Sequence, residues 1–147
     1  MMRISTKGEY GVRALFELAQ HEGEGPIQSA SIAARQHVPE KYLSQLLLIM
    51  RRKGLIHSIR GPQGGHMLAR PASDISLGEA LSVLEGPLLP MDCVKADFSD
   101  CCLLDMCVIR DVWRDLKAAT DDVLYSTTLA DLLHNQMQRE AEVMYYI

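Results

Sequence analysis

The feature of this sequence that most restricts its fold is a pair of helical stretches followed at once by a hairpin signal. One short helix is expected from about Ser29 to Gln36 and a second from Pro39 to Lys53, with a tight connection between them. Residues 55–60 and 66–70 are expected to form short strands, because they flank the glycine- and proline-rich turn at 61–65. This order of elements predicts a winged helix-turn-helix.

Helical patterns flank this unit on both sides. A capping box at Thr6–Glu9 predicts a helix before it, and another at Ser76–Glu79 predicts a helix after it that stops at Gly86. Apolar residues at nearly heptad spacing from about Asp105 predict the longest helix, and a cap within 126–131 opens the last one. The expected fold class is therefore mainly α with a small β-hairpin wing.

The charges divide the chain into two unlike halves. Residues 1–71 carry ten Lys or Arg against five Asp or Glu, whereas residues 72–147 carry five against fourteen. A basic half could bind a polyanion through Coulomb attraction and counterion release, and the acidic half would have to face away from that partner. We therefore predict two domains, a winged helix-turn-helix DNA-binding domain at 1–72 and a region with a cysteine loop and long helices at 73–147.

Composition excludes several classes of protein. With 147 residues, 48% apolar and 23% charged, the chain suits one compact core, and an aromatic content of 5% makes that core aliphatic. No apolar run approaches the roughly 18 residues of a membrane span and no signal-peptide stretch follows the start, so we expect a cytoplasmic protein outside the membrane. Phosphate-binding loops and hydrolase or metalloprotease motifs are absent, so no enzyme is expected. The five histidines are scattered and are expected at the surface rather than as ligands.

Polar and basic side chains collect on the second helix of the predicted motif and on its hairpin. Lys41, Ser44 and Gln45 lie near the amino end of the helix that would enter the major groove, where Ser44 or Gln45 could bond to base edges. Arg60, beside the turn, could reach a minor groove, whose negative potential attracts a guanidinium. Further cations are Arg51, Arg52, Lys53 and Arg70. A core helix with a solvated polar face would show the same pattern, so the adjoining hairpin is what favours DNA binding.

The cysteines are confined to a segment that begins without helical periodicity. Cys93, Cys101 and Cys107 are separated by seven and five residues, and Cys102 adjoins the middle one. Three or four thiolates on an irregular loop can converge on one metal centre, and soft sulfur donors suit an iron–sulfur cluster better than calcium or magnesium. The spacing differs from the paired Cys-x2-Cys of a zinc ribbon. A loop with free thiols, or a cysteine pair oxidised under stress, stays as the alternative.

Four segments together resemble one known family. They are residues 3–10 (Arg-Ile-Ser-Thr-Lys-Gly-Glu-Tyr), Tyr42-Leu43-x-Gln45-Leu46, Arg60-Gly61-Pro62-x-Gly64-Gly65, and the cysteine segment before Asp111-Val112-Trp113. They are similar to the iron–sulfur-cluster regulator family, the IscR, NsrR, RirA and CymR type of bacterial winged-helix repressor, over residues 2 to about 137. The resemblance implies a homodimer whose long dimerisation helices cross and whose two wings and recognition helices read a palindromic operator in double-stranded DNA.

The resemblance also assigns roles by position. It implies DNA contacts by Tyr42, Ser44, Gln45 and Arg60, with Lys41 as a neighbour, and an iron–sulfur cluster of the 2Fe-2S or 4Fe-4S type on Cys93, Cys101 and Cys107. Arg110 stands where IscR proteins have a histidine, and it cannot be a ligand because it stays protonated. The fourth ligand is open. Glu9 matches a position where NsrR-like members supply a carboxylate from the other subunit, although a capping box with Thr6 would also explain it, and Cys102 is the alternative.

The resulting expectation is a dimeric transcription regulator of the repressor type that senses iron, redox or nitric oxide status through the cluster. Within the same fold, the alternative is a CymR-like regulator without a cluster, controlled by a protein partner or by thiol oxidation. From a different class, a small thiol-rich metal or electron-transfer protein could dock an acidic partner through its basic half.

Overall fold

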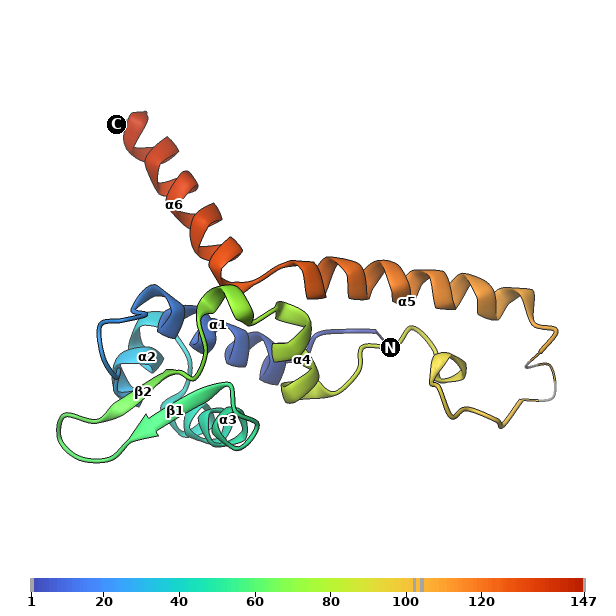
Figure 1. Cartoon of the computed structure of the whole chain (residues 1–147), viewed down its shortest axis with the longest axis horizontal. Helices are drawn as coiled ribbons and strands as arrows, with labels where there is room; N and C mark the ends of the chain where they lie inside the picture. Colours follow the sequence, from blue (N-terminus) through green and yellow to red (C-terminus); the bar gives the residue numbers. More distant parts are fainter. Residues whose placement is uncertain (1, 102, 104, 147) are drawn as a thin grey trace.

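The computed structural model describes residues 2–101, 103 and 105–146, and it is mostly helical with one antiparallel hairpin (Figure 1). In chain order the elements are α1 (Thr6–Gln20), α2 (Ser29–Gln36), α3 (Glu40–Arg52), β1 (Ile56–Ile59), β2 (Gly65–Leu68), η1 (Ala72–Asp74), α4 (Leu77–Glu85), η2 (Asp92–Val94), α5 (Val108–Ser126) and α6 (Leu129–Tyr145). The expected fold class is confirmed. Among the described residues, no helix is both long and apolar enough to cross a membrane.

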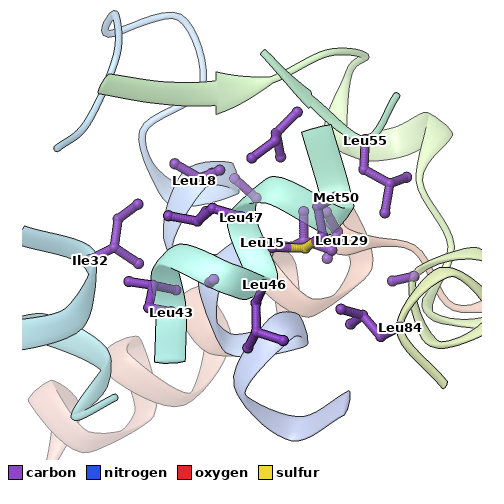
Figure 2. Close-up of a cluster of buried hydrophobic side chains, with 14 of the residues drawn as sticks. Leu15, Leu18, Ile32, Leu43, Leu46, Leu47, Met50, Leu55, Leu84 and Leu129 are labelled. Atoms are coloured by element: carbon purple, nitrogen blue, oxygen red, sulfur yellow. The ribbon is translucent and has the colours of Figure 1, made fainter. Parts of the chain in front are cut away.

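The core forms around the apolar stripe of α3 (Figure 2). Leu43, Leu46, Leu47 and Met50 recur at helical spacing and are all buried. Side chains drawn around them come from α1, α2, α4, α6 and the residue before β1: Leu15, Leu18, Ile32, Leu84, Leu129 and Leu55. Each fully buried leucine contributes about 1.5–3 kcal/mol relative to an exposed one. Because α4 and the first residue of α6 join this core, both regions of the predicted division at 72/73 contribute to it, and the division itself stays a prediction.

Helix α1 begins differently from the expected capping box. Its N-cap is Ser5, whose hydroxyl accepts the backbone N–H of Gly8 at 3.4 Å, and Thr6 is the first helical residue. A capping box needs the acidic residue three positions after the cap, and Glu9 stands four after it. Glu9 pairs instead with Arg13, one turn further along, at 2.5 Å. The capping-box explanation of Glu9 is therefore wrong.

The hairpin is fastened to the start of α2. The backbones of Ile27 and His66 exchange two hydrogen bonds, of 2.9 and 2.7 Å. Gly65 permits this approach, since its φ is +149° and a Cβ there would lie 2.5 Å from the carbonyl oxygen of Ile27. The side-chain amide of Gln28 also donates to the carbonyl oxygen of Pro62 in the turn at 3.2 Å. These contacts hold the wing against the start of α2, in addition to the hydrogen bonds between its own two strands.

Helix α5 extends away from the winged-helix part, and α6 leaves their shared corner in another direction (Figure 1). Helix α5 starts at Val108 with Cys107 as its N-cap, later than the expected Asp105. Its apolar stripe is 40–63% exposed at Ile109, Val112, Leu116 and Val123. A capping box between Thr128 and Asp131 starts α6, as expected. An aliphatic stripe of this length in solvent is typical of a surface that another helix covers.

Glu17 is a buried carboxylate that joins α1 to α2. It is 2% exposed, and its oxygens accept hydrogen bonds from Gln36 at 2.7 Å and Arg35 at 3.0 Å. Burial alone would raise the pKa of Glu17, but the bonds from Gln36 and Arg35 outweigh burial and hold the pKa below its usual 4.5. The carboxylate is therefore ionised at neutral pH and fixes α2 against α1.

Replacing Glu17 by Gln is expected to lower the free energy of unfolding at neutral pH by about 1–3 kcal/mol, because hydrogen bonds to a buried charge are lost. Since the folded pKa lies below the unfolded one, the stabilisation by Glu17 is present above pH 4.5 and is lost as the pH falls through the folded value. In urea titrations the variant should therefore lose less stability on acidification than the wild type. The matched control is Glu24→Gln, at a side chain that is 65% exposed; an equal loss in both variants would contradict the role of Glu17.

Candidate nucleic-acid interface and cysteine segment

The polar residues expected to read base edges lie on the exposed face of α3. Lys41, Ser44 and Gln45 are exposed in the first two turns, on the side of the helix away from the core stripe. The Ser44 hydroxyl donates to the backbone carbonyl of Glu40 at 3.0 Å, which leaves its oxygen as an acceptor. This face therefore presents a cation, an amide and a hydroxyl oxygen to any groove that α3 enters.

Tyr42 is less accessible than its neighbours on α3. It is half-buried, and its ring packs edge-to-face on Tyr10 of α1, with 5.8 Å between centroids and 73° between planes. The guanidinium of Arg13 lies over the Tyr10 ring at 5.9 Å from the centroid, and Arg13 is the ion-pair partner of Glu9. A continuous line of contacts thus runs from Glu9 in the first turns of α1 to Tyr42 on α3.

The two arginines that bound the wing lie in different surroundings. Arg60 follows β1 at the start of the turn and is exposed. Arg70, after β2, pairs with Glu79 of α4 and donates to the carbonyl oxygen of Asp74 at 3.5 Å. Arg60 is therefore the one of this pair that is placed to reach a ligand beyond the wing.

A polar cluster between the wing and the helices was missed by sequence reasoning. His66 on β2 is half-buried, with its Nε2 2.9 Å from the Ser29 hydroxyl and its Nδ1 2.8 Å from the Ser58 hydroxyl. Burial, and then the charge of Arg51, hold the pKa of His66 below its usual 6.5, so the ring is neutral at neutral pH. His66 is therefore only partly at the surface, where a surface position was expected. The hairpin register, which pairs Ser58 with His66, was the signal that could have found it.

The cysteine segment lies at the end of α5 that is far from the wing (Figure 1). Cys93 in η2 and Cys107 at the N-cap of α5 are half-buried, Cys101 is exposed, and all three are free thiols. Arg110, one turn after Cys107, is 9% exposed and donates its Nε–H to the carbonyl oxygen of Cys93 at 2.7 Å. This bond holds the backbone at Cys93 close to the start of α5. The alternative ligand Cys102 lies outside the described residues.

The thiols suit a metal centre in their chemistry, but the segment is open. Within the described part of the chain, no three His, Cys, Asp or Glu side chains form a group that could hold a metal ion. Cys101 and Glu9 are therefore not gathered with Cys93 and Cys107 into one site within a protomer. Three free thiols within fifteen residues nevertheless match the donors that iron–sulfur centres use.

Comparison with known proteins covers nearly the whole chain. The family model described as Rrf2, iron-dependent transcriptional regulator, matches residues 4–135. The HTH-type transcriptional regulator CymR of Bacillus subtilis (strain 168) is 38% identical over 146 residues, 99% of this chain and 100% of the relative. The regulator IscR of Serratia proteamaculans (strain 568) is 36% identical over 135 residues, 92% of this chain and 81% of the relative.

A solved structure supports the same assignment. The structure of T. potens IscR has a TM-score of 0.73 to this chain and 47% sequence identity, and the match covers 91% of this chain and 88% of that one. The curated relatives named here are transcriptional regulators and not enzymes. The chain belongs to the Rrf2 family of winged-helix transcriptional regulators.

Proposed function

We propose that this regulator is a homodimeric repressor whose affinity for a palindromic operator depends on an iron–sulfur cluster bound by Cys93, Cys101 and Cys107. The observation that carries the proposal is the position of two free thiols at the start of α5, the helix with the exposed apolar stripe: Cys107 is its N-cap, and Arg110 of α5 holds the backbone of Cys93. The third free thiol, Cys101, lies on the loop between these two cysteines. The family description, an iron-dependent transcriptional regulator, supports it. The signal is a change in cluster status through iron, redox state or nitric oxide.

The DNA-binding surface consists of the exposed face of α3 and the wing. Ser44 and Gln45 read base edges in the major groove, Lys41 and the Tyr42 hydroxyl bind phosphate, and Arg60 enters the minor groove. In a dimer, two such surfaces meet half-sites about one helical turn of DNA, or a multiple of it, apart. The basic charge of residues 1–71 supports this orientation, with the acidic remainder of the chain facing away.

The cysteine segment would bind the cluster through soft thiolate donors, and the cluster would supply a redox- and iron-responsive cross-link between η2 and α5. Arg110 contributes by holding the Cys93 backbone beside the start of α5. We propose Glu9 of the partner subunit as the fourth ligand, with Cys102 as the alternative. Ligation of iron by Glu9 would draw charge from its ion pair with Arg13, which touches Tyr10, the residue on which Tyr42 packs. Cluster status and the recognition helix would be coupled through these contacts.

The direct test is anaerobic purification followed by selection of DNA. The protein should be brown, contain iron and sulfide, and lose its visible absorbance on chelation. It should also select a palindromic duplex from a random pool, with binding that weakens steeply as salt rises. Colourless protein after reconstitution with iron and sulfide would contradict the cluster, and failure to select any duplex would contradict operator binding.

A second candidate function is a cluster-free regulator controlled by a protein partner or by thiol oxidation. The open arrangement of the cysteine segment among the described residues favours it, and so does the 38% identity to CymR over its full length. This candidate predicts a colourless protein that still selects a duplex. Its affinity would then change on reversible oxidation of the thiols rather than on removal of iron.

The variant Arg60→Ala is expected to weaken operator binding by about 1–3 kcal/mol and to relax sequence preference at the position that the wing contacts. The reason is the loss of a guanidinium from the minor groove. The matched control is Arg70→Ala, because Arg70 is already engaged with Glu79. Fluorescence anisotropy with the selected duplex measures both variants. Equal affinities for Arg60→Ala and the wild type would remove Arg60 from the interface.

A further inference from the structure

A pocket of about 310 Å³ lies between the start of α2, the exposed side of α3 and the hairpin. Its walls include Ser29 from α2, Ser44, Leu48 and Arg51 from α3, and Ser58 and His66 from the hairpin. Of the four α3 residues that line it, Ser44, Leu48 and Arg51 are spaced i, i+4 and i+7, so they lie along one face of that helix. This face adjoins Gln45, and the apolar Leu48 on it is 37% exposed.

The polar groups of this pocket are arranged to donate hydrogen bonds. A neutral imidazole has one N–H and one acceptor nitrogen, and each nitrogen of His66 meets a serine hydroxyl. One of these hydroxyls must therefore donate its proton to the ring, while the other accepts from the ring and keeps its own proton for a further acceptor. In either tautomer, the Ser29–His66–Ser58 chain leaves one hydroxyl proton available.

Charge gives the pocket its preference for an anion. Arg51 is exposed in the last turn of α3 and lines the pocket, and none of the described lining residues is acidic. The charge of Arg51 reaches His66, since it helps to lower the pKa of that ring. A small anion in the pocket would thus meet a permanent cation on one side and a neutral hydroxyl donor on the other.

We propose that this pocket binds one phosphate group of the operator backbone, with Arg51 as the charged donor and a serine hydroxyl, positioned by His66, as the neutral donor. The assignment rests on the DNA binding proposed above, and it adds a contact that joins α2, α3 and the wing around one phosphate. When a helix is inserted in a major groove, the anions that lie beside it are the phosphates of the DNA backbone. Because His66 of β2 holds the donor serine and Arg51 belongs to α3, binding also links the wing to α3.

The test compares two adjacent arginines. Arg51→Gln and Arg52→Gln remove the same charge from exposed positions of α3, but Arg52 does not line the pocket. Affinity is measured against salt with two duplexes, one selected by the wild type from a random pool and one of mixed sequence and equal length. Arg51→Gln should weaken both by a similar factor, roughly tenfold or more at low salt. For a dimer with two pockets, the slope of log affinity against log salt should fall by about 1.8. Arg52→Gln should change the slope by clearly less.

The hydroxyl is tested separately. Ser29→Ala and Ser58→Ala are compared, and the variant that lacks the donor hydroxyl should weaken both duplexes without changing the salt slope, since no counterion is involved. Threonine at that position should restore binding because it keeps a hydroxyl, and unchanged affinity in both alanine variants would overturn the hydroxyl contact. His66→Gln keeps polar atoms beside both serines and should weaken binding less than His66→Leu. Thermal unfolding of each variant checks the fold.

The outcomes separate this proposal from the proposed function. A wild type that binds neither duplex overturns both. A wild type that binds, with equal slopes for Arg51→Gln and Arg52→Gln, overturns the pocket alone. Inorganic phosphate titrated into DNA-free protein distinguishes the source of the anion. Saturable binding of free phosphate, together with unchanged DNA affinity in Arg51→Gln, would assign the pocket to a soluble anion and overturn the contact with DNA.

Discussion

Replacing Cys101 by Ala is expected to abolish the visible absorbance of the anaerobically purified protein and to give it the operator affinity of iron-depleted wild type. Loss of one of three thiolate ligands should reduce cluster retention by more than about 100-fold, because loss of an outer-shell partner alone costs roughly 10–100-fold. Cys101 is exposed and outside the hydrophobic core, so the thermal midpoint of the winged-helix part should not change. Iron and sulfide per protomer, visible spectra and anisotropy measure the result.

The matched control is Cys102→Ala, which removes a thiol from the adjacent position. With Glu9 of the partner subunit as the fourth ligand, it should keep the colour and the iron content; loss of colour in both variants would give the fourth position to Cys102. If Cys101→Ala stays brown while Cys102→Ala is colourless, the ligand role moves by one residue and the rest of the account stands. Full iron and sulfide content in both variants and in Cys93→Ala would contradict a cluster on this segment.

The double variant Val112→Glu/Leu116→Glu is expected to make the protein monomeric and to weaken binding of a palindromic duplex by roughly 100-fold or more. Both side chains lie on the exposed apolar stripe of α5, where two carboxylates would face the partner helix. Once the two subunits separate, each one binds a half-site alone, and the gain in affinity of about 100- to 10,000-fold from linking two binding sites is lost. Sedimentation analysis and anisotropy with full and half-site duplexes measure both effects.

The control for charge is Arg114→Glu, which changes the net charge by the same amount on another face of α5. Arg114 is 53% exposed and its nearest ion-pair partner, Asp111, is 3.9 Å away. This variant should stay dimeric. The double variant should bind a half-site duplex as well as the wild type does, because α5 contributes no side chain to the hydrophobic core among the described residues. A dimeric double variant would contradict the assignment of α5 as the interface.

The parts of the fold that follow from local rules could be predicted from the sequence. The 3.6-residue repeat of Leu43, Leu46, Leu47 and Met50 located the buried side of α3. The opposite side of the helix, which carries Gln45, must then be exposed. The turn at 61–65 located the hairpin, because glycine and proline there leave few alternatives. These are the elements that position the proposed DNA contacts.

The parts that depend on contacts between distant residues could not be predicted. The Ser29–His66 hydrogen bond joins residues 37 positions apart, and it exists because the hairpin folds back onto α2. The sequence shows Arg110 only as a residue unable to bind iron, whereas in the structure its guanidinium bonds the start of α5 to the Cys93 carbonyl. The N-cap of α1 is Ser5 rather than Thr6, and there the carboxylate of Glu85, 80 residues further along the chain, accepts the backbone N–H of Ser5.

The central claim is that the cluster on the cysteine segment changes how strongly α3 and the wing bind DNA. The most direct measurement is the affinity of one anaerobic preparation for its selected duplex at fixed salt, before and after removal of the cluster by chelation and again after reconstitution. The account predicts a change of at least about fivefold, the lower end of typical coupling between two sites, that reverses on reconstitution. Equal affinities in all three states, with the cluster demonstrably present and then absent, would contradict it.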